Sequence, residues 1–523
     1  MLTQAERIAE FANEPIQTFA DPESRQKMEA ALAAERAKFG AEYDLIIGGR
    51  PVKAAKQFVS RNPSKPDEIV GRLQSASAEQ AREAVDVAHR AFADWSRVAP
   101  QRRAELLFKA AEAVRSRRYE FDALLVLEVG KSWVEADADV AEGIDFLEYY
   151  GREMLRLGGD QALVPVSGER NAMRYIPLGV GAVIPPWNFA FAITVGMTAA
   201  AIVAGNTVVL KPSSDSPVIA ARFVELLASV GVPANVVSFL TGSGGAIGDE
   251  LIKHPRTRFV AFTGSKEVGL HINALAAQPQ AGQIWVKRVV AEMGGKDSIV
   301  VAADADLGAA VEGVAASAFG FQGQKCSACS RAIVEAPLYD EFIERLVDRT
   351  GKITVGDPAD PKNAMGPVIN QASRDKILAY IDVGKREGRL VYGGGSAPAD
   401  GGFFVEPTIF ADIPPESRLA QEEIFGPVLA VIKAKDYDDA LAIANNTEYG
   451  LTGSVYSNDP AKLERAAREF HVGNLYFNRK STGALVGAHP FGGFNMSGTD
   501  SKAGGPDYLL LFLQAKVVSE KVQ

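Results

Sequence analysis

Short apolar runs that alternate with helical segments restrict the fold of this chain more than any other feature. In a first block we predict strands at residues 180–184, 207–210, 236–240, 259–263 and 289–291, and helices at residues 193–204, 217–230 and 246–253. A second block with the same alternation extends from residue 298 to residue 478. Strands and helices that alternate in this way form a parallel sheet with helices on both faces. We therefore expect an α/β fold with two such units, and ligands beside the carboxyl ends of the strands.

The segments outside these blocks follow other patterns. Surface helices are expected before residue 43, and Ser77 with Gln80 fits a capping box that begins an amphipathic helix. Further helices are predicted at about residues 100–114, 119–129 and 134–155. Residues 351–427 are rich in glycine and proline, so loops should dominate there, and an alternating strand is predicted at residues 509–518.

The composition and charge of the chain exclude several classes of protein. Its 523 residues carry a net charge of −9 with a pI near 5.4, which argues against binding to nucleic acid or to anionic membranes. Two cysteines indicate a reducing compartment, and no secretory signal is visible, so we expect a cytoplasmic protein. Residues 175–210 are uncharged, but the sequence Pro185-Pro-Trp-Asn188 interrupts the run, so we predict a buried strand, a loop and a buried helix rather than a membrane span.

Both cysteines lie in residues 321–329, where glycine, glutamine and small polar residues indicate an ordered loop. Cys326 is a candidate nucleophile, because the thiolate is the reactive form and the neighbouring Lys325 would favour it. Simple packing in the core is the alternative for Cys326 and the expected role of Cys329. Two cysteines and five histidines give no second ligand pair at zinc spacing, so no metal site is expected.

Loops of small residues follow two neighbouring predicted strands. Gly244 and Gly248 lie where a strand gives way to a helix, a place suited to phosphate or to a simple tight turn. Ile247 stands where the dinucleotide fingerprint requires glycine. Residues 262–265 form a second such loop, and the two together favour a dinucleotide more than either loop does alone. Lys211, at another strand end, could reach a ribose or a phosphate, or could be a solvated turn residue.

Two polar residues at strand ends are candidates for catalysis. Glu292 could act as a general base if burial raises its pKa, and the adjacent Gly294 and Gly295 allow the backbone to approach a ligand. Asn188 could donate its side-chain amide N–H to an oxyanion, or could serve only to form a turn.

Taken together, these stretches resemble the aldehyde dehydrogenase superfamily. Its motifs occur in order and at the family's spacings as Pro186-Trp-Asn-Phe189, Lys211-Pro-Ser, Phe262-Thr-Gly-Ser265, Glu292-Met-Gly-Gly-Lys296, Gly323-Gln-Lys-Cys326 and Glu422-Glu-Ile-Phe-Gly-Pro427. The resemblance extends from about Gly48 to Val518. It implies a Rossmann-like NAD-binding domain (residues 1–156 and 175–290), an α/β catalytic domain (residues 291–485) and a small β oligomerisation flap (residues 157–174 and 502–523).

The resemblance also implies a mechanism and a cofactor. Cys326 would attack an aldehyde to give a thiohemiacetal, Asn188 and the backbone N–H of Cys326 would hold the oxyanion, and Glu292 would activate water to hydrolyse a thioester. NAD would be the main cofactor and NADP would be tolerated, because Ser214 replaces a glutamate that in strictly NAD-dependent relatives repels a 2′-phosphate. The implied cofactor-binding residues are Ile184, Pro185, Pro186, Trp187, Lys211, Ser214, Gly244, Gly248, Phe262, Thr263, Gly264, Ser265, Met293, Gly294, Glu423 and Phe425.

Within the family, the segments Lys480-Ser-Thr-Gly-Ala484 and Gly487-Ala-His-Pro-Phe-Gly-Gly493 are similar to those of members that oxidise L-glutamate γ-semialdehyde to L-glutamate in proline catabolism. The implied substrate contacts are Glu142, Phe189, Ser327, Gly483, Ala484 and Phe491. The hydroxyl of Ser327 and the backbone N–H groups of Gly483 and Ala484 suit an α-carboxylate. Glu142 would help to receive the α-amino group, with a solvated helix face as its alternative role.

The same resemblance bears on assembly and on rival functions. A projecting strand pair needs its edges covered, so a homodimer or a larger assembly of dimers is expected. The first ~40 residues are too few for a flavin barrel of about 250 residues, so we expect the stand-alone form rather than a fusion with a proline dehydrogenase. The rivals are an aldehyde dehydrogenase for another small molecule, such as succinate semialdehyde or betaine aldehyde, and a catalytically retired binding protein on the same fold.

Overall fold

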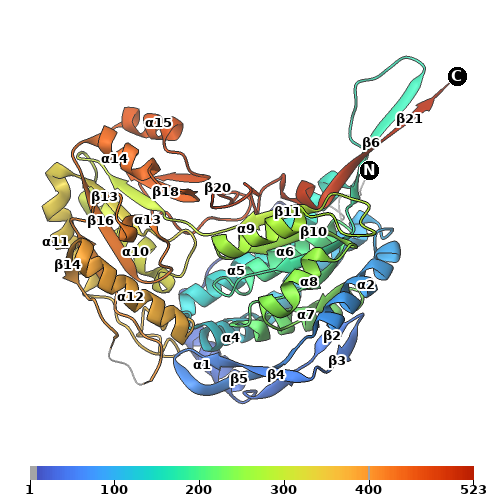
Figure 1. The fold of residues 1–523 in the computed structure, drawn as a ribbon, viewed down its shortest axis with the longest axis horizontal. Helices are drawn as coiled ribbons and strands as arrows, with labels where there is room; N and C mark the ends of the chain where they lie inside the picture. Colours follow the sequence, from blue (N-terminus) through green and yellow to red (C-terminus); the bar gives the residue numbers. More distant parts are fainter. Residues whose placement is uncertain (1–8, 398–400, 523) are drawn as a thin grey trace.

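The computed structural model describes residues 9–397 and 401–522, in which two α/β units lie side by side and a strand pair projects from one of them (Figure 1). The first unit is built on a seven-stranded sheet with the order β11-β10-β7-β8-β9-β2-β3. Its strands are β2 (Leu45–Ile47), β3 (Arg50–Val52), β7 (Val180–Ile184), β8 (Thr207–Leu210), β9 (Val237–Phe239), β10 (Thr257–Thr263) and β11 (Arg288–Glu292). From β7 to β11 the strands are parallel, so their carboxyl ends share one edge.

Helices cover both faces of this sheet, as the continuous apolar strands require. Successive residues of β8 and β10 point to opposite faces: Val208 and Ala261 join one core cluster, and Val209 and Val260 join the other. The helices of the first cluster are α3 (Pro100–Ser116), α4 (Arg118–Val129), α5 (Trp133–Leu157), α6 (Ala192–Val203) and α7 (Pro217–Ser229). Those of the second are α2 (Ala78–Trp95), α8 (Asp249–Lys253) and α9 (Lys266–Ala276).

The order of the strands creates a switch point. The chain passes from β7 to β8 and β9 on one side, and then returns to place β10 on the other side of β7. Loops that leave the carboxyl ends of β7 and β10 therefore diverge and leave a crevice between them, which is where open α/β sheets bind ligands.

A smaller three-stranded sheet lies at the bottom of Figure 1, beside α1 (Pro22–Arg36). Its order is β1-β5-β4, and its strands are β1 (Ala41–Tyr43), β4 (Lys56–Asn62) and β5 (Lys65–Ser75).

The second unit contains another seven-stranded sheet, with the order β14-β15-β16-β13-β12-β18-β19. Its strands are β12 (Ser298–Val301), β13 (Arg331–Glu335), β14 (Arg389–Tyr392), β15 (Thr408–Ala411), β16 (Val428–Ala434), β18 (Thr452–Tyr456) and β19 (Asn474–Phe477). Its helices are α10 (Leu307–Phe319), α11 (Tyr339–Thr350), α12 (Gln371–Glu387), α13 (Arg418–Gln421), α14 (Tyr437–Asn445) and α15 (Pro460–Glu469). Separate apolar clusters fill its two faces.

Two strand pairs complete the fold. The short pair β17 (Tyr449–Gly450) and β20 (Phe494–Asn495) lies near the junction of the units. Strand β6 (Glu169–Pro177) pairs antiparallel with β21 (Leu513–Lys521), and the two project beyond the helices (Figure 1). Val517 and Val518 on this projection are exposed.

The structure confirms the expected α/β fold, the capping box at Ser77 and Gln80, and the bounds of the strands at residues 180–184 and 207–210. One expectation was wrong: residues 508–512 form a 3-10 turn, so the final strand begins only at residue 513. Loops dominate the described part of residues 351–427 as expected, but α12 and the short elements α13, β14 and β15 also lie there. Within the described residues, no helix combines the length and the apolar character that a membrane crossing requires.

Candidate active site

Two cavities meet at Cys326, and Thr263 and Cys326 line both of them. The first cavity has a volume of about 220 Å³ and lies at the switch point between β7 and β10. The second has a volume of about 120 Å³ and lies between α5, α6 and the C-terminal loops. One thiol can therefore contact molecules held in either cavity.

Residues from six segments line the first cavity. Among them, Trp187 and Phe425 pack edge to face, with ring centroids 5.5 Å apart and nearly perpendicular planes. The lining residues are Pro186, Trp187, Asn188, Thr263, Gly264, Ser265, Met293, Gly294, Cys326, Ser373, Lys376, Glu423, Ile424 and Phe425. The sequence analysis predicted nine of these residues to bind the cofactor and two more, Asn188 and Cys326, to be catalytic.

The glycines after β11 permit a close approach in this cavity. A Cβ atom on Gly294 would lie 2.3 Å from Oε2 of Glu423, so only glycine fits beside this carboxyl group. The backbone N–H of Gly295 donates to Oε1 of Glu423 at 3.0 Å. Burial raises the pKa of Glu423, and the Lys376 ammonium donates to the Glu423 carbonyl at 3.1 Å. This edge of the cavity thus presents a carboxyl group and an ammonium, which suits the hydroxyls of a sugar.

The loop that carries Cys326 is held rigidly. Phe321 and Gln322 adopt positive φ angles of 48° and 57°, which non-glycine residues rarely do. The Gln322 side-chain amide donates to the carbonyls of Gly130 at 3.0 Å and Pro367 at 2.7 Å, which fixes this strained turn. The buried Asn188 donates its side-chain amide to the carbonyl of Gln324 at 3.1 Å, so it lies beside the loop as the sequence predicted.

The thiol of Cys326 is less acidic than the sequence suggested. Burial, and then the carboxyl groups of Asp297, Glu292 and Glu423, raise its pKa above the ordinary value. Lys325 does not offset this effect, because its ammonium pairs with Glu135 at 2.8 Å. The expectation that Lys325 favours the thiolate was therefore wrong, and the thiol needs a base. Cys329 is buried in the core of the second unit and lines neither cavity, which fits a packing role.

Glu292 ends β11 and lines the second cavity together with Cys326. Burial raises the pKa of Glu292 to about 7, although hydrogen bonds oppose the shift. The Ser501 hydroxyl donates to Oε1 at 2.6 Å, and the backbone N–H groups of Ser501 and Gly493 donate at 3.3 Å and 3.2 Å. A carboxyl group that titrates near pH 7 can accept and return a proton under physiological conditions.

The second cavity is lined by aromatic residues, buried carboxyl groups and the tail. Burial raises the pKa of Glu142, on α5, to about 8. The buried Lys131 ammonium lies 4.3 Å from the ring centroid of Phe189 and pairs with Asp139 at 2.9 Å. All six expected substrate contacts line this cavity: Glu142, Phe189, Ser327, Gly483, Ala484 and Phe491.

Seven of the expected cofactor-binding residues line neither cavity, but they lie near the same sheet edge. Ile184, Pro185 and Phe262 lie at or just after the ends of β7 and β10. Lys211 and Ser214 follow β8, where burial lowers the pKa of Lys211 to about 8. Gly244 and Gly248 bound a short π-helical turn rather than the first turn of an α-helix.

Sequence reasoning missed several residues of the site. Ser373 and Lys376 come from α12, in the region expected to be loop, and Asn370 caps that helix by accepting from the Ser373 N–H at 2.8 Å. The cap, followed by isoleucines four residues apart at 377 and 381, was a signal that could have revealed the helix. In the second cavity, Phe146, Tyr150, Ile193, Gly196, Met197, Ala503 and Tyr508 were also missed.

Comparisons with known proteins give one consistent result. A family model described as "Aldehyde dehydrogenase family" matches residues 51–518. The chain is 56% identical to the 1-pyrroline-5-carboxylate dehydrogenase of Geobacillus thermodenitrificans and 55% identical to that of a Geobacillus species, covering 98% of this chain and 99% of each relative. A solved structure of the Thermus 1-pyrroline-5-carboxylate dehydrogenase with bound NAD is 50% identical, with a TM-score of 0.97, and covers 98% of this chain and 99% of that chain.

Proposed function

The chain belongs to the aldehyde dehydrogenase family, and from this premise we propose that it oxidises L-glutamate γ-semialdehyde to L-glutamate with NAD, a step of proline catabolism. The semialdehyde is the open form of 1-pyrroline-5-carboxylate. The observation that carries the proposal is the single thiol of Cys326 shared by two cavities, with the carboxyl group of Glu292 in the second.

Cys326 is the nucleophile in this proposal. Its sulfur forms a bond to the aldehyde carbon, and the thiol proton passes to a base, which the raised pKa of the thiol makes necessary. Glu292 lines the same cavity and can take that proton, directly or through water.

The carbonyl oxygen becomes negative as the sulfur adds, and amide groups stabilise it. One side-chain N–H of Asn188 donates to the Gln324 carbonyl in the loop of Cys326, which fixes the amide, and its second N–H would donate to the oxyanion together with the backbone N–H of Cys326. Amide donors of this kind lower the barrier by about 3 kcal/mol each when they are fixed in advance.

The first cavity fits a dinucleotide. Glu423 and Lys376 would bind the hydroxyls of the nicotinamide ribose, and Trp187 and Phe425 offer aromatic surfaces to a flat ring. Ser265 would bind the pyrophosphate, and Lys211, which follows β8 outside the cavity, would bind the adenosine ribose. When bound there, NAD supplies the acceptor for the hydride that leaves the thiohemiacetal carbon, so that the carbon bound to sulfur is left as a thioester. NADP is tolerated in this proposal, because Ser214 carries no charge to repel a 2′-phosphate.

Glu292 then activates water. After it has released the thiol proton to solvent, its carboxylate removes a proton from a water molecule that attacks the thioester carbon. The carbon–sulfur bond breaks, glutamate leaves, and Glu292 returns the proton to the sulfur of Cys326. The raised pKa of Glu292 makes it a stronger base than an ordinary carboxylate. Gly483, Ala484 and Ser327 receive the α-carboxylate of the substrate, and Phe189 and Phe491 contact its aliphatic stem. Glu142 faces the α-amino group.

The assembly and the location of the protein complete the proposal. The pair β6–β21 projects with exposed valines, so a second copy of the chain would cover it in a homodimer or in a larger assembly of dimers. Two free cysteines suit the reducing cytoplasm.

A substrate panel tests the proposal. NADH formation is followed with L-glutamate γ-semialdehyde, succinate semialdehyde, betaine aldehyde and propanal at matched concentrations. We expect kcat/KM to be at least about tenfold higher for L-glutamate γ-semialdehyde than for any other aldehyde, because only this substrate engages both the carboxylate loop and Glu142. A preference for another aldehyde would contradict the substrate, and a lack of NADH with every aldehyde would favour the retired binding protein.

A further inference from the structure

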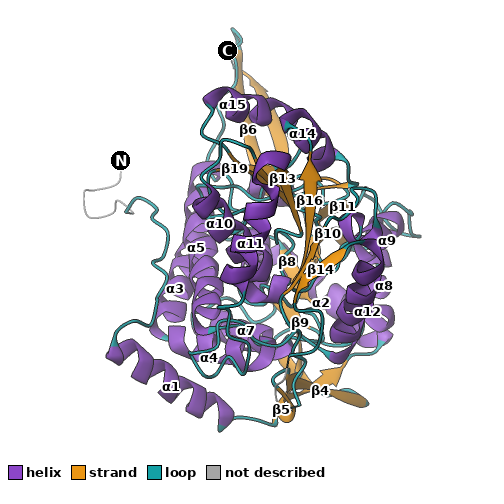
Figure 2. Ribbon diagram, turned by 90° about the vertical axis from the view of Figure 1, so that its left-hand side faces the viewer, coloured by secondary structure: helices purple, strands orange, loops and turns teal. Residues whose placement is uncertain are grey.

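The segment before α1 runs beside α3 and α5 (Figure 2). Its Asn13 contacts the loop that carries Gly483 and Ala484, which line the second cavity. The side-chain amide of Asn13 donates to Oδ2 of Asp145 on α5 at 2.8 Å and to the carbonyl of Val486 at 3.0 Å. Val486 is buried and lies two residues after Ala484. One amide group therefore ties the loop of Gly483 and Ala484 to α5, which carries Glu142.

Aromatic residues close the same junction. The rings of Phe11 and Tyr149 meet edge to face with centroids 5.2 Å apart. A Cβ atom added to Gly487, whose φ is +79°, would lie 3.1 Å from both rings. The turn of the loop therefore packs directly against the N-terminal segment. Asn13 lies where this segment, the loop and α5 meet.

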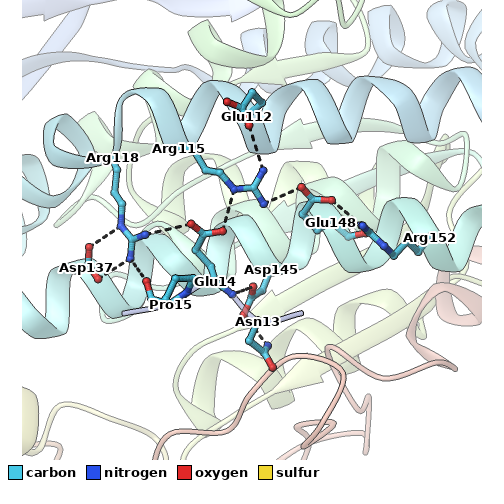
Figure 3. Close-up of polar contacts among 10 residues, drawn as sticks. All are labelled: Asn13, Glu14, Pro15, Glu112, Arg115, Arg118, Asp137, Asp145, Glu148 and Arg152. Atoms are coloured by element: carbon cyan, nitrogen blue, oxygen red, sulfur yellow. Dashed lines mark hydrogen bonds and ion pairs between the residues drawn. The ribbon is translucent and has the colours of Figure 1, made fainter. Parts of the chain in front are cut away.

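The N-terminal segment is itself fixed to the helices by charged groups (Figure 3). The backbone N–H of Glu14 donates to Oδ1 of Asp145 at 2.7 Å, and the Glu14 carboxylate pairs with Arg115 at 2.9 Å and Arg118 at 3.2 Å. Arg118 also binds the buried carboxylate of Asp137. These contacts fix the position of Asn13, so that its hydrogen bond to the Val486 carbonyl can restrain the loop.

The far side of the loop is held by other contacts. The backbone N–H of Gly487 donates to the Gly504 carbonyl at 2.8 Å, and the Gly504 N–H donates to the hydroxyl of Tyr150 at 2.9 Å. Tyr150 lines the second cavity. Hydrogen bonds therefore hold the loop on two sides, through the tail on one side and through the N-terminal segment on the other. Both sets of bonds end on α5, at Tyr150 and at Asp145.

We propose that Asn13 is a positioning residue for the substrate: by joining Val486 to Asp145, it fixes Gly483 and Ala484 at the distance from Cys326 that an aldehyde bearing a carboxylate requires. The inference rests on the proposed function, in which these two residues receive the substrate carboxylate. It assigns a role in substrate selection to a segment more than 300 residues from the nucleophile in sequence.

The test compares two substrates in the variant Asn13→Ala. We expect KM for L-glutamate γ-semialdehyde to rise roughly three- to tenfold, the equivalent of one or two lost hydrogen bonds. KM for propanal, which has no carboxylate to anchor, and KM for NAD should stay within twofold of wild type, and kcat should change little. Asn13→Asp should raise the semialdehyde KM further, because its carboxylate cannot donate to Val486 and lies against Asp145.

Gln17→Ala is the matched control. Gln17 belongs to the same segment and accepts from the Tyr119 hydroxyl at 3.0 Å, but no contact of its side chain reaches the loop. Its variant should lose some thermal stability and keep the wild-type KM for both aldehydes. A general structural effect of the segment would instead raise KM equally in Gln17→Ala and Asn13→Ala, which would overturn the inference.

Hydrogen exchange gives a second readout that needs no substrate. Amides in the peptide that covers residues 480–490 should exchange faster in Asn13→Ala than in wild type, and the peptide around Cys326 should not change. If Asn13→Ala folds poorly, Asn13→Ser serves in its place. If both the exchange and the semialdehyde KM were unchanged in Asn13→Ala, the inference would be overturned and the proposed function would stand. If the wild-type protein were inactive on the semialdehyde, both would be overturned.

Discussion

The two cavities on either side of Cys326 are built from different parts of the chain. The first is formed mainly by loops at the ends of parallel strands, where glycine and small residues bring the backbone close to a ligand. The second is formed by the faces of α5 and α6 and by loops of the tail, which are far apart in sequence. The first is the kind of site that many proteins with this sheet share, and the second is specific to what this chain binds.

The two cavities also differ in their titrating groups. Glu142 and Glu292, with pKa values raised to about 8 and about 7, both line the second cavity. Changes of pH near 7 should therefore act on substrate turnover through Glu292, whereas Lys211, whose pKa burial lowers to about 8, makes cofactor binding sensitive to pH near 8. The following substitutions should affect the two cavities differently.

The largest effect is expected from Cys326→Ala, which removes the atom that the cavities share. Turnover should fall by about a thousandfold or more, because no other group can form the thioester. NAD should still bind, because the rest of the first cavity is intact, and quenching of tryptophan fluorescence would measure this. Cys329→Ala is the control and should retain nearly full turnover. Turnover of Cys326→Ala above one part in a hundred would contradict the assignment.

Glu292→Gln should separate the two halves of the reaction in time. Hydrolysis of the thioester should slow by about a hundredfold or more, because the amide cannot take a proton from water. Rapid mixing should then show a burst of NADH about equal to the enzyme concentration, formed more slowly than in wild type because the amide cannot take the thiol proton either, and followed by still slower turnover. A steady rate equal to that of wild type, without a burst, would show that another group activates water.

Ser501→Ala should shift the pH dependence without abolishing activity. Glu292 acts as a base only when ionised, so kcat of the wild type should fall as the pH drops below about 7. The Ser501 hydroxyl stabilises the ionised form, so its loss raises the pKa of Glu292 and moves this fall to higher pH. The pH profile of kcat measures the shift. Thr499→Val, which loses contacts with Ala291 only, should keep the wild-type profile.

The smallest effect is expected from Ser214→Glu, which should change cofactor binding alone. A carboxylate near the adenosine ribose should raise KM for NADP roughly tenfold by repulsion of the 2′-phosphate and leave KM for NAD and for the aldehyde unchanged. Steady-state kinetics with each cofactor would measure it. If wild type showed no activity with NADP, the premise that Ser214 tolerates the phosphate would be lost.

The same contrast explains what the sequence could reveal. The strands that end at Ile184 and Leu210 were predicted with their observed bounds, because a buried parallel strand is an uninterrupted apolar run between turn residues. α12 was missed, because charged residues fill much of it and glycine and proline surround it. Residues 263–265 and Gly294 lie directly at the ends of such strands, so local patterns identified them, whereas Trp187, Glu423 and Phe425 came from the family resemblance.

The second cavity was only partly predictable. Its six expected contacts came from family resemblance, and residues such as Phe146 and Met197 gave no local signal, because an apolar helix face facing a cavity looks like one facing the core. Lys325 shows the same limit for electrostatics. Cys326 is adjacent to Lys325 in sequence, but the Lys325 ammonium pairs with Glu135, which lies 190 residues away. Because of this distant partner, the ammonium does not favour the thiolate of Cys326.

The pairing of β6 with β21 has a consequence for synthesis of the chain. Arg170 binds Glu520 across the two strands, 350 residues later in the sequence. At a ribosomal rate of about 5–20 residues per second, β6 must wait roughly 20–70 s for its partner. During that interval an unpaired edge with apolar side chains is presented to other nascent chains, so this arm is where a molecular chaperone would be needed most.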